Sequence, residues 1–416
     1  MDGDPAVEPE LDSFSLTFPL PYRVSFIIVL AVWAWGVNLH YLYLLKIDVP
    51  ALIRYPARSS PLHPPHHLST YRLATVLSAV FVFSMLLFWV FTHRNPALVL
   101  RWDWLPLGYL VVLAVLFAVP NARNRLSDKG RARFRSILKR IAVGGIAEAK
   151  DGKFGDILLA DVLTSYAKVF GDLYVTLCMF FRSSSGSATA RPDRSCGGTV
   201  VVPLIMSLPS LIRLRQCLIE YGRVRRGPLS PATGWGGQHL ANALKYSTAF
   251  PVIIFSALLR SAGESPAYYR LWVLACAVNS FYSFYWDVAK DWDLTLFNGA
   301  RERGAPGHAF GLRRILRVGP PALYYAVIAA DLLFRCTWSL KLSPHLGRLA
   351  DHEGSIFMLE LLEVFRRWVW IFFRVETEWI RNNSSSSAGL IGLPADDILL
   401  GDYDGGSSKY EDEVRG

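Results

Sequence analysis

Charged residues are scarce in this 416-residue sequence. Only 19% of its residues are charged and 52% are hydrophobic, whereas about 25% charged residues are usual for a soluble globular chain. The five cysteines stand apart with no CxxC spacing, which argues against a zinc site or a disulfide framework. The sequence has no P-loop, nucleophile elbow or HExxH motif. The composition therefore predicts a membrane protein that is not an enzyme and that binds no metal or other cofactor.

Apolar windows of about 20 residues, long enough to cross a bilayer as helices, recur along the whole chain. We count about nine of them. The predicted fold is all-α: a polytopic integral membrane bundle of about nine transmembrane helices in the lipid bilayer. The windows are residues 22–45, 73–91, 105–119, 157–181, 200–218, 240–259, 268–287, 320–340 and 356–380.

The charges between the windows predict how the chain is oriented. The net charge of +10 lies mainly in short loops, so it indicates membrane orientation and not nucleic-acid binding. Residues 1–21 are acidic and lack the basic start of a cleaved signal peptide, so we expect a lumenal N-terminus and a retained first span. The most basic loop, NARNRLSDKGRARFRSILKR, is expected in the cytosol. An odd number of spans also puts the acidic, Gly/Ser-rich tail of residues 384–416 there, and its composition predicts disorder.

The last window carries charges that a bilayer would not tolerate on its lipid face. In residues 355–381, Glu363, Arg367 and Arg374 fall within about 40° of one another on a helical wheel. A charge at the bilayer centre costs roughly 2.5–3.5 kcal/mol on insertion scales, so this face is expected to line a polar interior. Three further residues widen the stripe to about 120°: Glu360, Arg366 and Trp370.

Five other windows also carry polar side chains on one helical face. Structural ion pairs between helices are one interpretation of such stripes. The arginines favour another, because several guanidinium groups in one interior can bind a phosphate-like anion in bidentate fashion, with nearby carboxylates orienting them. The stripes contain Asp161, Ser165, Lys168 and Asp172; Arg213, Gln216 and Glu220; Asn242, Lys245 and Tyr246; Asn279, Tyr282, Ser283, Trp286, Asp287 and Lys290; and Tyr324, Asp331, Arg335 and Trp338.

Three weaker patterns have ordinary explanations. Asp291-Trp292-Asp293 has the DxD form of many glycosyltransferases, but no soluble α/β domain is predicted around it. His63, His66 and His67 could touch a metal, although their proline-rich surroundings favour a solvated loop. The basic amphipathic segment Arg131–Ile141 is predicted to lie on the cytosolic leaflet, with a solvated loop helix as the alternative.

The same windows contain recognisable motifs. LADVLTSYAKVFGDLYVTLC, FYSFYWDVAKDWDLTLF and, above all, LEVFRRWVWIFFRVE resemble the EXS domain over residues 155–383. That family includes the phosphate exporter of animal cells, which also serves as a retrovirus receptor, and a shorter Golgi protein needed to retain endoplasmic-reticulum and Golgi residents. The resemblance implies inorganic phosphate as substrate. It puts phosphate-path residues at Asp161, Arg213, Lys245, Tyr246, Asp287, Arg335, Trp338, Glu363, Arg366 and Arg367, to which the stripes add Asp172, Asp331 and Arg374.

The resemblance favours the short Golgi type of this family. The long exporters have a soluble SPX domain before the first span, and this sequence has about 20 residues there, followed by the spans and loops of residues 22–154. Expected partners are phosphate, Golgi glycosyltransferases and a coat adaptor, and a homodimer is a candidate assembly. The prediction is therefore a multi-pass Golgi protein that moves phosphate from lumen to cytosol and supports glycosyltransferase recycling. The alternative is a sorting receptor for glycosyltransferases that transports nothing.

Overall fold

The fold is helical throughout the part of the chain that can be described. A computed structural model describes residues 11–55, 65–119, 128–182, 187–227, 235–261, 265–342 and 352–387. Within these ranges helices are joined by turns and loops, and no strand occurs. The all-α prediction is confirmed for them. Residues 388–416, most of the predicted tail, lie outside the described residues.

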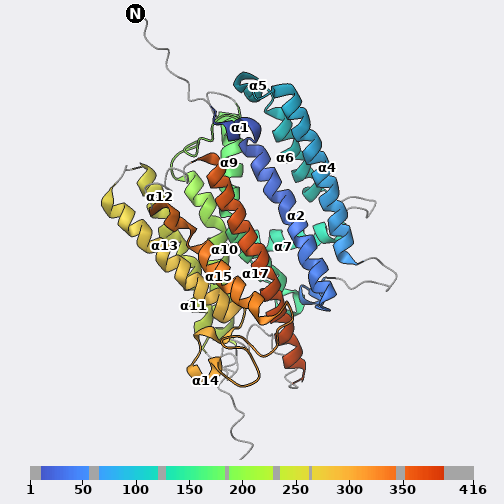
Figure 1. Ribbon diagram of the computed structural model, residues 1–416, viewed down its shortest axis with the longest axis vertical. Helices are drawn as coiled ribbons and strands as arrows, with labels where there is room; N and C mark the ends of the chain where they lie inside the picture. Colours follow the sequence, from blue (N-terminus) through green and yellow to red (C-terminus); the bar gives the residue numbers. More distant parts are fainter. Residues whose placement is uncertain are drawn as a thin grey trace, which may run out of the picture.

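The helices form an N-terminal group and a larger C-terminal group (Figure 1). The N-terminal group comprises α1 (Ser13–Thr17), α2 (Leu20–Leu44), α3 (Val49–Leu52), α4 (His66–Thr92), α5 (Pro96–Arg101), α6 (Trp104–Ala118) and α7 (Asp128–Ala142). The C-terminal group comprises η1 (Ala149–Asp151), α8 (Lys153–Ser165), α9 (Ala167–Arg182), α10 (Val201–Arg226), α11 (Gly237–Ser247), α12 (Ala249–Ser261), α13 (Pro266–Trp286), η2 (Asp287–Asp291), η3 (Thr295–Phe297), α14 (Ala300–Arg303), α15 (Pro321–Arg335), η4 (Thr337–Leu342) and α17 (Glu353–Ser387).

Several helices are long and apolar enough to span a membrane. Among the described residues five segments meet this condition by length and composition, so the chain is a multi-pass membrane protein. The count of about nine is not confirmed and stays a prediction. Among the remaining windows, one is interrupted at the α8–α9 break, α15 has 15 residues, α17 is rich in charge, and the 21-residue α13 contains many Tyr, Trp, Ser and Asn side chains. The five segments are Leu20–Leu44, His66–Thr92, Pro96–Ala118, Val201–Arg226 and Gly237–Ser261.

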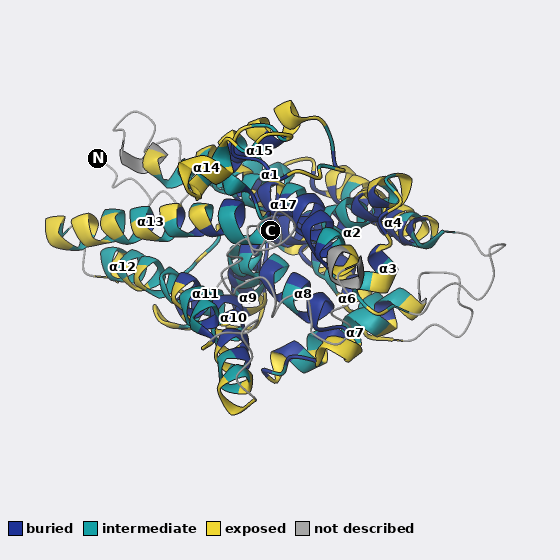
Figure 2. Ribbon diagram, turned by 90° about the horizontal axis from the view of Figure 1, so that it is seen from below, coloured by how far each residue is buried: buried dark blue, intermediate teal, exposed yellow. Residues whose placement is uncertain are grey.

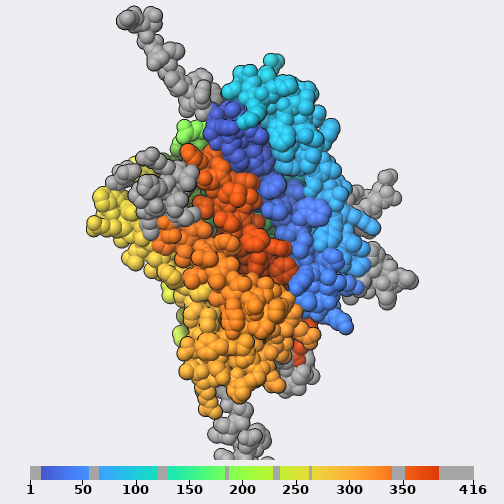
Figure 3. All heavy atoms as spheres, viewed as in Figure 1, coloured from blue at the N-terminus to red at the C-terminus, as the bar shows by residue number. Residues whose placement is uncertain are grey.

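Helix α17 lies at the centre of the molecule and joins its two groups. It contacts α2 on one side and α8, α15 and η2 on the other, and the buried residues concentrate around it in the end-on view (Figure 2). In the space-filling view its surface runs between that of α2 and that of the C-terminal group (Figure 3). The aromatic rings of Trp292 and Tyr324 pack on Phe373 at centroid distances of 5.4 and 4.9 Å. Packing of these large buried rings on one face of α17 fixes the rotation of the helix about its axis, and therefore the direction in which its charged stripe points.

Helices α2, α4 and α6 form an aromatic-rich core of their own. Tyr22 of α2 shares a 2.7 Å hydrogen bond with Ser84 of α4. Tyr109 of α6 donates to the Leu77 carbonyl at 2.8 Å. Buried hydroxyls therefore find partners on neighbouring helices, as the low dielectric of an apolar interior requires.

The basic segment predicted to lie on the membrane surface forms α7, which packs on protein. Ile137 and Ile141 on its apolar face are buried against Ala160 of α8. The Arg140 guanidinium forms an ion pair with the fully buried Asp156, and these contacts raise the pKa of Arg140 above its ordinary value. At least part of its amphipathic face is thus used for contact with α8.

One disulfide corrects the expectation from cysteine spacing. Cys178 of α9 and Cys196 of the following loop are bonded, with their Cα atoms 6.1 Å apart. The cysteine spacing argued against a disulfide framework, and one disulfide nevertheless forms here. Its 18-residue separation carries no motif, and the contact depends on the loop folding back over α9. Cys217 and Cys336 form no disulfide with any residue that the structure describes.

Candidate functional site

Two broken helices and one π turn place backbone ends in the middle of the bundle. Helix α8 ends at Ser165 and α9 begins at Ala167, while α11 ends at Ser247 and α12 begins at Ala249. Helix α13 continues into η2, a π-helix, in which Trp292 N–H donates to the Asp287 carbonyl at 2.8 Å. Discontinuous helices and π turns are frequent at binding sites, because they free polar groups and redirect side chains. The charged residues of the sequence stripes gather around these three points.

The first cluster joins α8, α10 and α11. The Arg213 Nε donates to an Asp161 carboxylate oxygen at 2.6 Å, and the Tyr246 hydroxyl donates to the same oxygen. The Arg213 Nη1 donates to Gln216 Oε1 at 2.6 Å. All four side chains are buried. Charge-assisted hydrogen bonds in this cluster hold three helices together.

The second cluster lies on α15, η2 and α17. Asp331 accepts from Arg335 and Arg366 at 3.0 Å each. Asp287 forms ion pairs with Arg335 and, at 3.4 Å, with Arg366, and its other oxygen is 3.5 Å from the Lys245 ammonium of α11. Two buried carboxylates therefore balance much of the charge of three cations. Structural pairing between helices, the alternative to anion binding, explains most of these contacts.

Arg367 is different from its neighbours. Its Nε donates to the Ser165 hydroxyl at 2.9 Å, its Nη2 lies 3.4 Å from the Thr164 hydroxyl, and its guanidinium stacks 4.5 Å from the Trp370 ring centre. It takes part in no ion pair within 4.0 Å among the described residues, and its buried Nη1 has no hydrogen-bond partner there. Glu363 is instead held by Arg366, at 2.6 Å. Arg367 is thus a buried cation without a direct counter-charge.

Three predicted path residues lie apart from these clusters. Trp338 of η4 donates to Ser280 at 3.0 Å, and Ser280 donates to the Arg335 carbonyl at 2.9 Å, so the indole contacts the second cluster only indirectly. Asp172 of α9 lies near Arg194, at 3.8 Å. Arg374 of α17 lies 3.9 Å from Asp291, at the end of η2. A role for these three residues along a phosphate path stays a prediction.

Asp172 belongs to an outer cluster that the sequence only partly revealed. The Glu353 carboxylate, at the start of α17, accepts from Arg23 of α2 at 2.6 Å and from Arg194 of the disulfide loop at 2.7 Å. Burial alone would raise the pKa of Glu353, but hydrogen bonds and charge from the two arginines hold that pKa below its ordinary value. Arg23 stood inside an apolar window and could have been noticed, whereas Arg194 in a Ser/Gly-rich loop gave no signal.

A further buried acid was also missed. Glu376 lies about 220° around the α17 wheel from Glu363, away from the charged stripe. It is fully buried, pairs with Arg313, and accepts from the Tyr324 hydroxyl at 2.8 Å. These contacts fasten the segment between α14 and α15, and the start of α15, onto α17. They make Glu376 a structural anchor.

The weaker sequence patterns gain no support as enzyme or metal sites. Asp291 forms ion pairs with Lys245 and Arg374 at 3.5 and 3.9 Å, and no strand occurs in the described chain around the DxD pattern. His63 lies outside the described residues. His67 stacks on His40 at 4.3 Å, and no group of three or more potential ligands forms a metal site among the residues described.

Comparison with known proteins agrees with the motifs. Residues 18–380 match the EXS family, a stretch that includes the earlier helices. The chain is 27% identical to "Protein ERD1 homolog 2" of Schizosaccharomyces pombe, with 86% of this chain and 95% of that protein covered. It is 30% identical to "Protein ERD1" of Kluyveromyces lactis, covering 76% and 81%. It is 31% identical to "Solute carrier family 53 member 1" of Mus pahari, covering 59% of this chain and 36% of that protein.

Proposed function

The chain belongs to the EXS family, and from this premise we propose that it transports inorganic phosphate. Arg367 is the observation that carries the proposal. A buried arginine without a counter-charge is costly in a low-dielectric interior unless an anion completes the site. Its planar fork suits tetrahedral oxyanions, which accept two parallel hydrogen bonds.

The surroundings of Arg367 fit a site that is occupied only part of the time. Lys245, Arg335 and Arg366 have carboxylate partners, so the empty site avoids an uncompensated group of like charges. Glu363 beside them is partly exposed, at 38% of its side chain. A phosphate bound at Arg367 would draw on the shared charge of the second cluster without breaking its ion pairs.

The proposal also covers the membrane in which the protein lies and the direction in which phosphate moves. We place the protein in the Golgi membrane, with phosphate moving from lumen to cytosol and glycosyltransferase recycling as the supported process. Similarity to the two ERD1 proteins over most of this chain supports the short type of the family. The predicted loop charges support a cytosolic C-terminus. A sorting receptor that transports nothing is the alternative, and it requires no unpaired arginine in the bundle.

Phosphate flux into liposomes tests the proposal directly. Purified protein is reconstituted, and labelled phosphate entry is followed with Arg367→Lys as the test variant and Arg225→Lys as the control. Arg225 is exposed at the end of α10. Wild type and the control should transport, and Arg367→Lys should lose at least about tenfold, because two forked hydrogen bonds of about 1.5–3 kcal/mol each to a charged group are replaced by a point charge. A correctly folded wild type with no phosphate flux would favour the receptor.

A further inference from the structure

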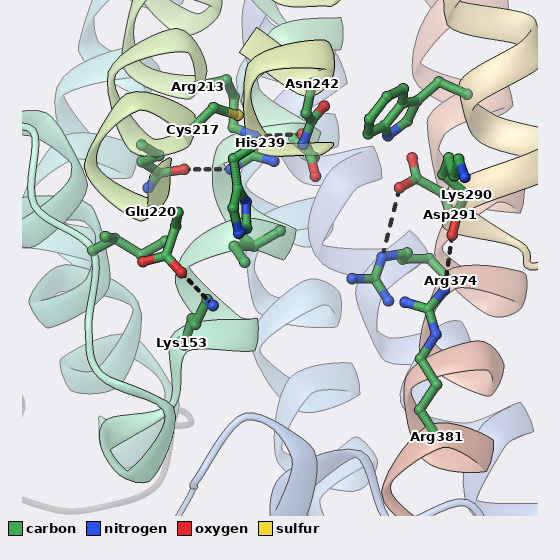
Figure 4. A pocket seen from close by; sticks show the side chains of 15 residues that line it. Lys153, Arg213, Cys217, Glu220, His239, Asn242, Lys290, Asp291, Arg374 and Arg381 are labelled. Atoms are coloured by element: carbon green, nitrogen blue, oxygen red, sulfur yellow. Dashed lines mark hydrogen bonds and ion pairs between the residues drawn. The ribbon is translucent and has the colours of Figure 1, made fainter. Parts of the chain in front are cut away.

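A polar cavity adjoins the first cluster on the side of α17 that carries Arg374 and Arg381 (Figure 4). Its volume is about 60 Å³, and α8, α10, α11, η2 and α17 all contribute to its lining. A single water needs about 10–15 Å³ on this measure, so a small hydrated ion fits. The cavity shares Asp161, Arg213 and Gln216 with the first cluster and extends to Glu220, Asn242 and Asp291, which are not among the predicted path residues.

The lining of this cavity is basic overall. Five basic and three acidic side chains line it. Each acid already has a basic partner in the lining: Asp161 with Arg213, Glu220 with Lys153, and Asp291 with Arg374. The excess of basic side chains in the lining favours binding of an anion over binding of a cation.

Unused hydrogen-bonding atoms define the ligand more closely. Gln216 is fully buried, its Oε1 accepts from Arg213 at 2.6 Å, and its Nε2 has no acceptor among the described residues. The bond from Arg213 fixes the orientation of the amide, so Nε2 is a donor. On the same cavity, Asn242 Oδ1 and Asp291 Oδ2 receive no hydrogen bond from the described chain, although Oδ2 is 3.5 Å from Lys245 Nζ. The cavity thus offers an unused donor together with unused acceptors.

We propose that this cavity is an inner anion site that selects the protonated form of phosphate, with Gln216 donating to it and Asp291 accepting from it. Phosphate keeps at least one P–O–H group at neutral pH, so it both accepts and donates hydrogen bonds. Sulfate carries no proton and can only accept, so it would leave a buried carboxylate facing a negative oxygen. The inference rests on the proposed phosphate transport and adds a residue that rejects sulfate.

The test compares two aspartates of one segment. Asp291→Asn turns a side chain that only accepts into one that can also donate, while Asp293→Asn makes the same charge change at a residue outside the lining. Asp293 has a left-handed backbone with φ of 53°, which asparagine tolerates well. Purified proteins are titrated with phosphate and with sulfate while melting temperature is recorded, and sulfate inhibition of phosphate flux is measured in liposomes. Asp291→Asn should improve sulfate affinity relative to phosphate by about tenfold or more, and Asp293→Asn should match wild type.

Gln216→Glu gives a second, independent measurement. The substitution keeps the oxygen that accepts from Arg213 but replaces the cavity donor by a negative acceptor, so binding of both anions should weaken by about tenfold or more. Unchanged phosphate-to-sulfate selectivity in a folded Asp291→Asn protein, or unchanged anion binding in Gln216→Glu, overturns the inner site even where wild-type flux is normal. Selective binding by a wild type that shows no flux would retain the inner site and reject transport alone.

Discussion

Adjacent arginines on α17 should respond in opposite ways to the same substitution. Arg366 and Arg367 are both buried, at 4% and 6% exposure, and each can be replaced by methionine, which keeps most of the stem volume and removes the charge. Arg366 has several carboxylate partners, whereas Arg367 has none within 4.0 Å among the described residues. Arg366→Met should therefore impair folding, and Arg367→Met should impair transport.

The magnitudes follow from the partners that each substitution leaves behind. Arg366→Met removes bonds of 2.6 Å to Glu363 and 3.0 Å to Asp331, and breaking a buried pair costs about 3–5 kcal/mol. Arg367→Met removes a bond to Ser165, but that hydroxyl still donates to Glu363 at 2.6 Å. The Thr164 and Trp370 contacts are lost as well, but no buried carboxylate loses its partner and the desolvation cost of the cation disappears, so the net cost should be about 1.5 kcal/mol, the lower end for a hydrogen bond to a charged group. The two variants should differ by about 1.5 kcal/mol or more.

Two measurements separate these effects. Unfolding of the purified proteins in mixed micelles gives their relative stabilities, and phosphate flux in liposomes gives their transport. Arg367→Met should unfold close to wild type, lose phosphate flux and lose any stabilisation by added phosphate. The reasoning is refuted if Arg367→Met is as unstable as Arg366→Met, or if it transports phosphate at the wild-type rate.

Three further predictions concern the ends of the spans. The thiols of Cys178 and Cys196 should react with a maleimide only after reduction, because they form a disulfide. Disulfides persist in oxidising compartments, so the reagent should reach these thiols from the side of the membrane opposite the C-terminus. Labelling of these two cysteines without reduction, or from the C-terminal side of the membrane, would contradict this. Because the pKa of Glu353 is depressed, its carboxylate stabilises the fold above the unfolded-state pKa of about 4.3, and this stabilisation is lost as pH falls from there through the lower folded-state pKa. Glu353→Gln should therefore lower the melting temperature at pH 7 and flatten the dependence of melting temperature on acid pH. An unchanged profile would show that the Glu353 carboxylate does not stabilise the fold. Deleting residues 388–416 should alter Golgi localisation or glycosyltransferase retention while phosphate flux persists; normal sorting would make the tail dispensable.

Periodicity was sufficient to find the charged faces, because side chains on one helix are placed by its geometry alone. The 100° rotation per residue brought Glu363, Arg367 and Arg374 together before any packing was known. The same rule could not choose partners across helices. Glu353 and Arg23 are 330 positions apart, and their contact depends on how α17 and α2 pack.

Helix breaks were partly encoded and were overlooked. Pro251 stands at the third position of α12 and has no N–H for the Ser247 carbonyl, so one hydrogen bond that would join α11 to α12 is missing and a break is favoured. The break at Tyr166 has no proline or glycine beside it. There the hydroxyls of Thr164 and Ser165 contact Arg367 from the end of α8. Tertiary contacts of this kind decide a break that local propensity does not.

The meaning of each arginine depends on packing in the same way. The sequence presented Arg213, Arg335, Arg366 and Arg367 as equivalent cations in a polar interior. Folding pairs the first three with acids from other helices and leaves Arg367 with hydroxyls and an indole. Because a helical wheel contains one helix, it records where a charge points and not what neutralises it. The residue with the strongest claim on an anion is therefore identified by a missing partner, which becomes visible only when all the surrounding helices are in place.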